Sequence, residues 1–318
     1  MAYQRAQKAA GTGQNKLFIL LLAFALFLSA AKDLERVQSF TSNVRGFVSS
    51  HMGLPVYASE VPPLPEICPQ AMAQEQKREE FHWAGPIASG QSIEIKGING
   101  GITAEPARGG QVEVFATKKA RRSDPSSVDI KVVPHAAGVT ICATYPGESG
   151  QRTSCDPSAL NVPSSNVNVV NNDVSVEFMV KVPQGVSFIG RTVNGEISAL
   201  SLDGNVDSRT VNGNIDVSTT GYARAKTVNG QITAKMGRAD WTDALEFKTV
   251  NGGIALDLPA SLSTKIEAET FNGEISSDFP LTVLGRISRK RMSGTIGEGG
   301  RQLLLKTLNG SIHLRRAS

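Results

Sequence analysis

The chain has 318 residues, of which 40% are hydrophobic and 19% charged, so it can bury a sizeable core and is not a disordered tail. Its 31 glycines, 6% aromatic residues and three cysteines exclude a collagen-like chain, a disulfide-dense mini-protein and a cysteine-rich zinc protein. The formal net charge is +4. Residues 1–31 carry three basic residues and no acid, so the remainder has 30 basic and 29 acidic residues and is nearly neutral.

An export signal is predicted over residues 1–31. Arg5, Lys8 and Lys16 precede an apolar run that ends in small residues near Ala31, as in a signal peptide or a signal anchor. The run is shorter than the roughly 20 residues that cross a bilayer comfortably, which favours cleavage. Apolar residues continue at three- and four-residue steps from Leu34, which favours a retained apolar helix. Both outcomes stay open, and either places the rest of the chain outside the cytoplasm, in the cell envelope.

Residues 32–79 are predicted to form a helix followed by a spacer. Five prolines lie between residues 53 and 75, and proline cannot continue a helix. A tether between membrane and body is the expected role of this segment. Cys68, in the same segment, is expected to be unpaired.

An internal repeat dominates the second half of the chain. Six near-identical strings are TVNGEI at Thr192, TVNGNI at Thr210, TVNGQI at Thr227, TVNGGI at Thr249, TFNGEI at Thr270 and TLNGSI at Thr307. A degenerate copy, RMSGTI, starts at Arg291, and an outlier, GINGGI, starts at Gly97. Successive copies are 16 to 22 residues apart, which is typical of stacked structural repeats.

The pattern inside each copy argues against a hairpin at Asn-Gly. A two-residue turn would pair Val193 with Glu196, and the equivalent residues of other copies would be equally poor partners. As one extended strand, each copy instead places Val193, Gly195 and Ile197 or their equivalents on one face, with threonine and asparagine on the other. Inward glycines would let neighbouring backbones approach closely.

The predicted fold class is therefore all-β, with a β-solenoid or β-helix-like body over residues 80–318. Turn signals every 8 to 11 residues also allow an antiparallel sandwich or meander. Upstream, residues 92–95, 111–114 and 174–180 alternate in hydrophobicity and are predicted strands.

Three features together carry a resemblance. They are the string Ile98-Asn99-Gly100-Gly101-Ile102, the V-P-x-G string at Val182, and the serial T-V-N-G-x-I copies. In combination they resemble an adhesin-like family of bacterial envelope proteins, a domain of unknown function, over roughly residues 80–318. The resemblance implies a repetitive β-helix-like fold on an exported or membrane-tethered chain, with no established enzymatic activity. An insertion at about residues 121–167 departs from the family pattern.

The insertion contains two of the three cysteines. Cys142 and Cys155 lie on either side of a turn-rich segment. In an oxidising compartment, they are predicted to form a disulfide. Two free buried thiols are the alternative.

No catalytic, metal or cofactor site is predicted. The four histidines, at positions 51, 82, 135 and 313, share no metal-ligand spacing, and no motif of a hydrolase, P-loop or calcium site occurs. The alternative is a carbohydrate-active β-helix enzyme. Its carboxylates would be Glu196 and Asp216, expected about 8 Å apart, whereas Glu196 and Glu274 would lie four coils and roughly 19 Å apart.

The predicted binding surface is an outward ladder of hydroxyls and amides. Its members are Thr192, Asn194, Thr210, Asn212, Thr227, Asn229, Thr249, Asn251, Thr270 and Asn272. Glycans, envelope polymers or other envelope proteins are the expected partners. The alternative is that these side chains bond along the stack and maintain the fold. Nucleic acid is not expected, because the one basic concentration, at Arg286, Arg289, Lys290, Arg291, Arg315 and Arg316, lacks interleaved aromatic residues.

The predicted function is that of a non-catalytic, exported or membrane-tethered envelope protein. Its repetitive surface would serve adhesion, scaffolding or envelope maintenance.

Overall fold

A computed structural model describes residues 76–147, 150–158, 172–283 and 288–317. The chain divides into two units, residues 1–70 and 71–318, and every described residue belongs to the second. The predicted export signal, the helix, the proline-rich spacer up to residue 75 and Cys68 therefore lie outside the described residues. Within the described ranges, the structure contains no helix of sufficient length and apolarity to cross a bilayer.

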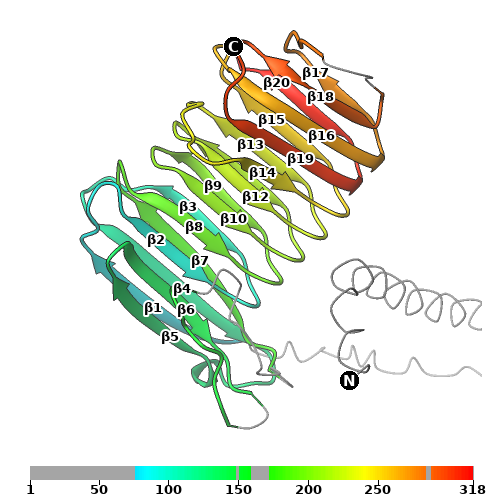
Figure 1. Cartoon of the computed structure of the whole chain (residues 1–318). Coiled ribbons are helices and arrows are strands. Elements are labelled where there is room, and N and C mark those ends of the chain that lie inside the picture. The colour runs from blue at the N-terminus through cyan, green and yellow to red at the C-terminus, as the bar shows by residue number, and fades with distance from the viewer. Residues whose placement is uncertain (1–75, 148–149, 159–171, 284–287, 318) are drawn as a thin grey trace, which may run out of the picture. The chain divides into compact units, whose positions relative to one another are not determined.

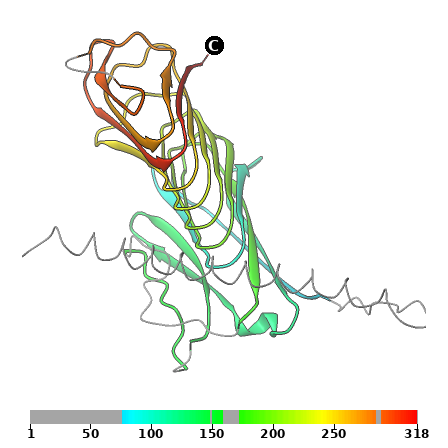
Figure 2. The same cartoon turned by 90° about the vertical axis from the view of Figure 1, so that its right-hand side faces the viewer.

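The described body is all-β and consists of two open ten-stranded sheets (Figures 1 and 2). The first sheet contains, in spatial order, β1 (Lys77–Gly85), β4 (Val112–Ala120), β7 (Ser175–Val182), β3 (Ile102–Pro106), β9 (Ile197–Leu202), β11 (Ile215–Thr219), β13 (Ile232–Met236), β15 (Ile254–Leu258), β20 (Ile312–Arg316) and β17 (Ile275–Ser277). The second contains β18 (Arg291–Ile296), β16 (Thr264–Asn272), β19 (Gln302–Asn309), β14 (Leu245–Lys248), β12 (Ala223–Lys226), β10 (Val206–Arg209), β8 (Ser187–Arg191), β2 (Ser92–Lys96), β6 (Gly138–Thr144) and β5 (Asp129–His135).

The chain alternates between the sheets from β8 to β17, so each coil contributes one strand to each sheet. Neighbouring coils pair in parallel and in register, as Ile197 with Ile215 and Ile215 with Ile232 show. The body is thus solenoid-like. The antiparallel sandwich or meander alternative is wrong for these central strands, because a meander would pair successive strands in opposite directions.

Spatial order departs from chain order at the C-terminal end. The coil of β19 and β20 lies between the coil of β14 and β15 and that of β16 and β17. Asn309 consequently bridges Asn251 on one side and pairs with Asn272 on the other. Glu196 and Glu274 are therefore five coils apart in the stack, and the expected four coils were wrong.

Antiparallel strands flank the parallel coils. β1 and β4 pair antiparallel at one end of the first sheet, β5 pairs antiparallel with β6 at one end of the second sheet, and β18 pairs antiparallel with β16 at its other end. The segment identified as an insertion is part of the fold, because it contains the 3₁₀ helix η1 (Pro125–Ser127), β5 and β6. The strands predicted near residues 92, 111 and 174 are present as β2, β4 and β7.

Each Asn-Gly pair lies at a corner between the two sheets. β8 ends at Arg191 and β9 begins at Ile197 in the other sheet, which confirms that Asn-Gly does not close a hairpin. The predicted continuous strand is wrong, because the backbone bends between the two strands. Thr192 is consequently buried and Val193 partly exposed, the reverse of the expected faces, whereas Ile197 is buried as expected.

The core lies between the sheets and is built from rows of identical or similar apolar residues. Ile197, Ile215, Ile232, Ile254 and Ile312 form one such row, and each is at most 1% exposed. Each buried isoleucine stabilises the fold by roughly 1.5–3 kcal/mol relative to an exposed one. At the corners, a Cβ added to Gly213 would lie 2.0 Å from the carbonyl oxygen of Gly195, which confirms the expected close backbone approach.

Candidate functional site

The threonines of the repeat stabilise the corners from inside. Thr192, Thr210, Thr227, Thr249 and Thr270 are between 0% and 5% exposed, so their expected outward placement is wrong. Each hydroxyl donates a hydrogen bond to a glycine carbonyl of the neighbouring coil, for example Thr210 Oγ1 to Gly195 O at 2.9 Å and Thr227 Oγ1 to Gly213 O at 3.0 Å. We refer to these residues, with Thr307, as the threonine row; their observed contacts are structural.

The asparagines do face outward, as expected. In spatial order, the asparagine row consists of Asn99, Asn194, Asn212, Asn229, Asn251, Asn309 and Asn272. From Asn194 onward, each Nδ2 donates to the Oδ1 of the preceding asparagine in this order at 2.7 to 2.9 Å, so Asn99 only accepts. Bonding along the stack, the alternative role predicted for this ladder, is thus present. Each amide still has a second N–H and a second oxygen lone pair that a ligand can use.

An apolar row runs beside the asparagines, at the position before each of them. Its members are Ile98, Val193, Val211, Val228, Val250, Leu308 and Phe271. Val211, Val228, Leu308 and Phe271 are 36%, 39%, 40% and 64% exposed. The alternation of side chains along a continuous strand would have placed these residues on the buried face. The bend at the corner turns them toward solvent instead.

A basic row lies three positions before the asparagines, on six strands of the second sheet. Its members, each in register with the next, are Lys96, Arg191, Arg209, Lys226, Lys248 and Lys306. Glu269 occupies the next position. This row was not predicted from the sequence, although the signal is present: the residue before Thr is Lys or Arg in five of the six repeat strings.

The group of basic residues identified from the sequence lies close to carboxylates. Arg289, Arg291 and Arg315 lie 3.5, 3.5 and 3.9 Å from Glu274, Glu269 and Asp257 respectively. Arg286 lies outside the described residues. The prediction that these residues form the one basic concentration of the body is wrong, because the register of the second sheet assembles a longer basic row.

Carboxylates compensate part of the basic row. Arg209 contacts Asp207 at 3.1 Å, and Lys226 forms an ion pair with Glu246. The Lys226 hydrogen bond, together with the charges of Lys226, Lys248 and Lys306, lowers the pKa of Glu246 below its ordinary value, against the opposing effect of desolvation. Among the described residues, Lys248 and Lys306 form no ion pair of their own. This part of the row therefore has excess positive charge.

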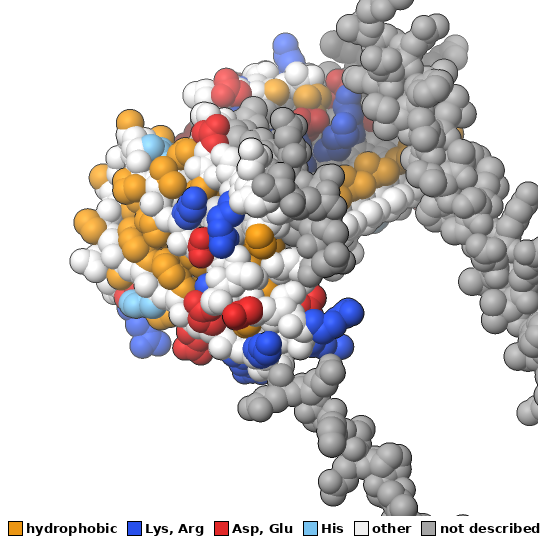
Figure 3. All heavy atoms as spheres, turned by 90° about the horizontal axis from the view of Figure 1, so that it is seen from below, with side chains coloured by type: hydrophobic (Ala, Val, Ile, Leu, Met, Phe, Trp, Pro, Cys, Tyr) orange, Lys and Arg blue, Asp and Glu red, His pale blue; other side chains and the backbone are white. Residues whose placement is uncertain are grey.

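The basic and apolar rows border a groove of about 550 Å³. The threonine row lies between them, and the groove extends over four coils, from Arg191 to Lys248 and from Val193 to Val250. The space-filling view shows basic side chains close to a line of hydrophobic side chains (Figure 3). Charged, apolar and hydroxyl-bearing residues thus recur coil by coil along one corner of the stack.

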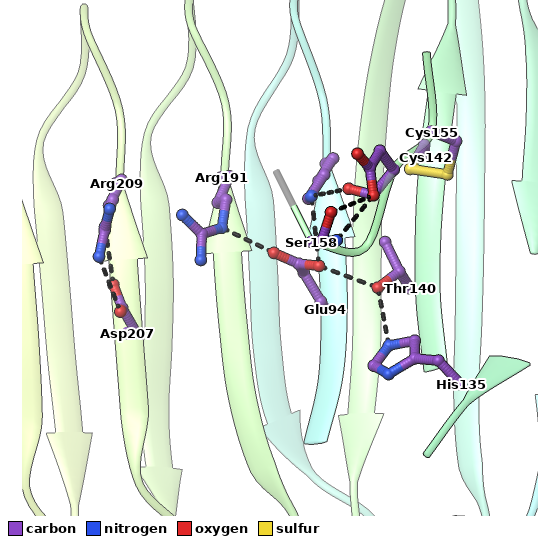
Figure 4. A network of polar contacts seen from close by, with 11 residues as sticks. Glu94, His135, Thr140, Cys142, Cys155, Ser158, Arg191, Asp207 and Arg209 are labelled. Atoms are coloured by element: carbon purple, nitrogen blue, oxygen red, sulfur yellow. Dashed lines mark hydrogen bonds and ion pairs between the residues drawn. A yellow bond between two sulfur atoms is a disulfide. The ribbon is translucent and has the colours of Figure 1, made fainter. Parts of the chain in front are cut away.

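The basic row is buried at its N-terminal end. Glu94 Oε1 lies 2.7 Å from Arg191 Nε, Glu94 Oε2 lies 3.4 Å from Lys96 Nζ, and all three side chains are at most 6% exposed (Figure 4). Burial lowers the pKa of Lys96, against the opposing effect of Glu94. Thr140 donates to Glu94 at 2.9 Å. Lys96 and Arg191 therefore have a structural role, and Arg209 is the first accessible cation of the row.

The predicted disulfide is present. Cys142 and Cys155 are bonded, with their Cα atoms 5.7 Å apart. Cys142 is in register with Lys96, whose Nζ donates to the carbonyl oxygen of Asp156 at 2.6 Å. The disulfide thus fastens the segment after Tyr145 beside the buried end of the basic row.

The described part of the chain has no cluster of three or more histidine, cysteine, aspartate or glutamate side chains that could hold a metal ion. His82 stacks on Phe115, His135 contacts Thr140, and His313 contacts Ser276; His51 lies outside the described residues. Glu196 is exposed and Asp216 half-buried on neighbouring coils.

Comparisons with solved structures give distant likenesses. The chain is similar to a candidate cell adhesion protein from Clostridium sporogenes, with 12% identity, 76% of this chain and 100% of that chain covered, and a TM-score of 0.40. It is also similar to a candidate adhesin from Bacteroides fragilis, with 11% identity, 75% and 97% coverage and a TM-score of 0.23. No curated protein matches the chain.

The family comparison is more direct. The family described as Toastrack DUF4097 matches residues 153–315, just over half of the chain. This match includes all six repeat strings. That T-V-N-G-x-I strings characterise the family as a whole stays a prediction. The chain belongs to the Toastrack DUF4097 family.

Proposed function

We propose that this protein is an exported, non-catalytic envelope protein whose coiled β-body presents a repetitive surface for adhesion, scaffolding or envelope maintenance. The observation that carries the proposal is the corner of the stack, where asparagine, apolar and basic rows repeat in register over at least five coils. Repetition at a fixed spacing suits a repetitive ligand, whereas an enzyme concentrates its chemistry at one place.

Two further observations support the envelope location. The Cys142–Cys155 disulfide fits an oxidising compartment. The basic and apolar residues at the start of the chain fit an export signal. Whether that segment is cleaved or retained decides between a released and a membrane-tethered protein, with residues 32–79 as the spacer in the tethered form.

The proposal is tested by co-sedimentation of the purified full-length chain with isolated envelope fragments and whole cells. We expect saturable binding that denatured chain does not show, and no soluble sugar products during incubation. If the folded chain binds neither cells nor envelope fragments, the proposed surface role is wrong. If sugar products appear and are lost with Glu196→Gln or Asp216→Asn, the protein is an enzyme instead.

A further inference from the structure

In the accessible part of the basic row, neighbouring positive charges require negative charge close by. Arg209, Lys226, Lys248 and Lys306 lie on four successive strands, which neighbour each other at about 4.8 Å in a sheet. Like charges in such direct register repel one another. Asp207 and Glu246 pair with two of the four cations, and Glu269, which lies beside Lys306, pairs with Arg291. An anionic ligand along the row would therefore remove an unfavourable interaction.

The direction of the groove indicates the form of this ligand. The groove crosses the strands, since each of its four coils contributes one cation and one valine, and three of them also contribute a threonine. A ligand that meets several cations must therefore run along the stack and carry negative charges repeatedly. A single small anion would contact only one or two coils.

The backbone at the groove floor leaves no place for an added β-strand. Thr210 N donates to Lys226 O at 3.0 Å, and Thr227 N donates to Lys248 O at 2.9 Å. The hydroxyls of the same threonines are hydrogen-bonded to glycine carbonyls. A peptide strand gains affinity mainly from free main-chain groups, so an acidic peptide is a poor fit, and recognition must come from side chains.

The flanking rows favour a sugar chain over a nucleic acid. Single-stranded nucleic acids bind through aromatic side chains on which bases stack, and the described groove lining contains none. The apolar row offers aliphatic surface to the C–H face of a sugar ring, and the outward amides of the asparagine row can bond its hydroxyls. One ring of an extended polysaccharide also advances the chain by close to one strand spacing.

We propose that the groove between the basic and apolar rows binds a linear anionic polysaccharide that runs along the stack, perpendicular to the strands. Its carboxylates or phosphates pair with Arg209, Lys226 and Lys248 in the groove, and with Lys306, which is in register with Lys248 on the next strand beyond the groove lining. Its rings pack on Val211, Val228 and Val250. This inference rests on the proposed surface function and specifies the ligand class.

The test is calorimetric titration of the full-length chain, in non-ionic detergent, with an oligogalacturonate long enough to span five coils. The charge control is the same oligomer as its full methyl ester. The groove variant combines Lys248→Gln, which lies in the groove lining, with Lys306→Gln, which is in register with it on the next strand. The matched variant is Lys235→Gln with Lys265→Gln, two exposed lysines outside the groove that likewise form no ion pair among the described residues.

We expect the acidic oligomer to bind and the methyl ester to bind at least about tenfold more weakly. The groove variant should lose about tenfold in affinity, and the slope of log K against log salt should fall by about two, because each phosphate- or carboxylate-paired cation contributes roughly one. The matched variant should stay within about twofold of the wild type. Unchanged melting temperatures of both variants would show that folding is intact.

Several results would overturn the inference. One is equal binding of the acidic oligomer and its methyl ester, and another is an undiminished affinity of the groove variant. A third is that anionic lipid vesicles, single-stranded DNA or linear polyphosphate bind more tightly than every charged sugar oligomer, including phosphorylated glycans. If one of these results is obtained but the chain still binds envelope fragments, only the ligand class is refuted. If the chain binds neither the sugar oligomers nor the envelope fragments, the surface function is refuted as well.

Discussion

The carboxylate of Glu94 lies 2.7 Å from the guanidinium of Arg191, 97 residues later in the chain, and both side chains are 6% exposed. The two residues are on β2 and β8, neighbouring strands of the second sheet. Glu94 also faces Lys96, so one buried carboxylate compensates two buried cations. Such a group is expensive to remove, because its partners then keep their charge without compensation.

The first prediction concerns this carboxylate. We expect Glu94→Gln to lower the free energy of unfolding by about 3 kcal/mol, since one partner of a buried ion pair is lost. Guanidinium unfolding of the wild type and variant measures the difference. The control is Glu105→Gln, whose pair with Lys181 is partly exposed and should contribute less than about 1 kcal/mol. Equal losses in the two variants would contradict the prediction.

The second prediction concerns the corner glycines. A Cβ at position 213 would overlap the carbonyl oxygen of Gly195, so we expect Gly213→Ala to cost roughly 2–3 kcal/mol. Gly109→Ala is the control, because nothing lies within 4 Å of its added Cβ. It should be neutral or slightly stabilising. Thermal unfolding compares the two, and a Gly213→Ala chain as stable as the wild type would disprove the close contact.

The third prediction distinguishes structural from binding threonines. Thr227→Val removes the hydroxyl that donates to Gly213 O and should lower the free energy of unfolding by about 1 kcal/mol. Thr227→Ser keeps the donor and should cost less. Because the hydroxyl is buried, neither change should alter binding to envelope fragments. A binding defect in folded Thr227→Val would restore the threonines as ligand contacts.

The fourth prediction concerns the disulfide. Replacing Cys142 and Cys155 by serine should lower the free energy of unfolding by roughly 3 kcal/mol in the chain-entropy description of a short loop. A reducing agent should destabilise the wild type by a similar amount and leave the double variant unchanged. Equal sensitivity of both proteins to the reductant would contradict a stabilising Cys142–Cys155 bond.

The fifth prediction concerns pH. Asp173 accepts hydrogen bonds from the backbone N–H groups of Ser123, Arg122 and Arg121 at 2.8 to 3.1 Å. The Ser123 hydrogen bond is the main cause that lowers the pKa of Asp173 well below its ordinary 3.8. A lowered carboxyl pKa stabilises the fold above the unfolded-state value, and this contribution is lost as pH falls through the folded-state value.

We therefore expect the wild type to lose stability below about pH 4 more steeply than Asp173→Asn. Unfolding midpoints measured across the acidic range check this. The comparison variant is Asp240→Asn, which removes an exposed carboxylate whose nearest basic atom is 3.9 Å away. Parallel acid profiles for the wild type and Asp173→Asn would contradict the prediction.

The sequence by itself determined the all-β class, the repeat, the buried isoleucine row and the disulfide pair. These follow from local chemistry, because alternation of apolar and polar residues predicts a strand wherever it occurs. The recurrence of isoleucine at the same position of each copy also predicted their stacking. Asn194 and its equivalents face outward as the same alternation predicts.

Only the tertiary structure decided which side chains are buried at the corners and which coils are neighbours. A bend between two sheets interrupts the period of two, so Thr192 is buried and Val211 exposed. Spatial order differs from chain order, which places Asn309 between Asn251 and Asn272. The repeat strings place a basic residue before most of the threonines, but Lys248 and Lys306 are distant in the chain. They become neighbours only through the register of β14 and β19, which no local pattern encodes.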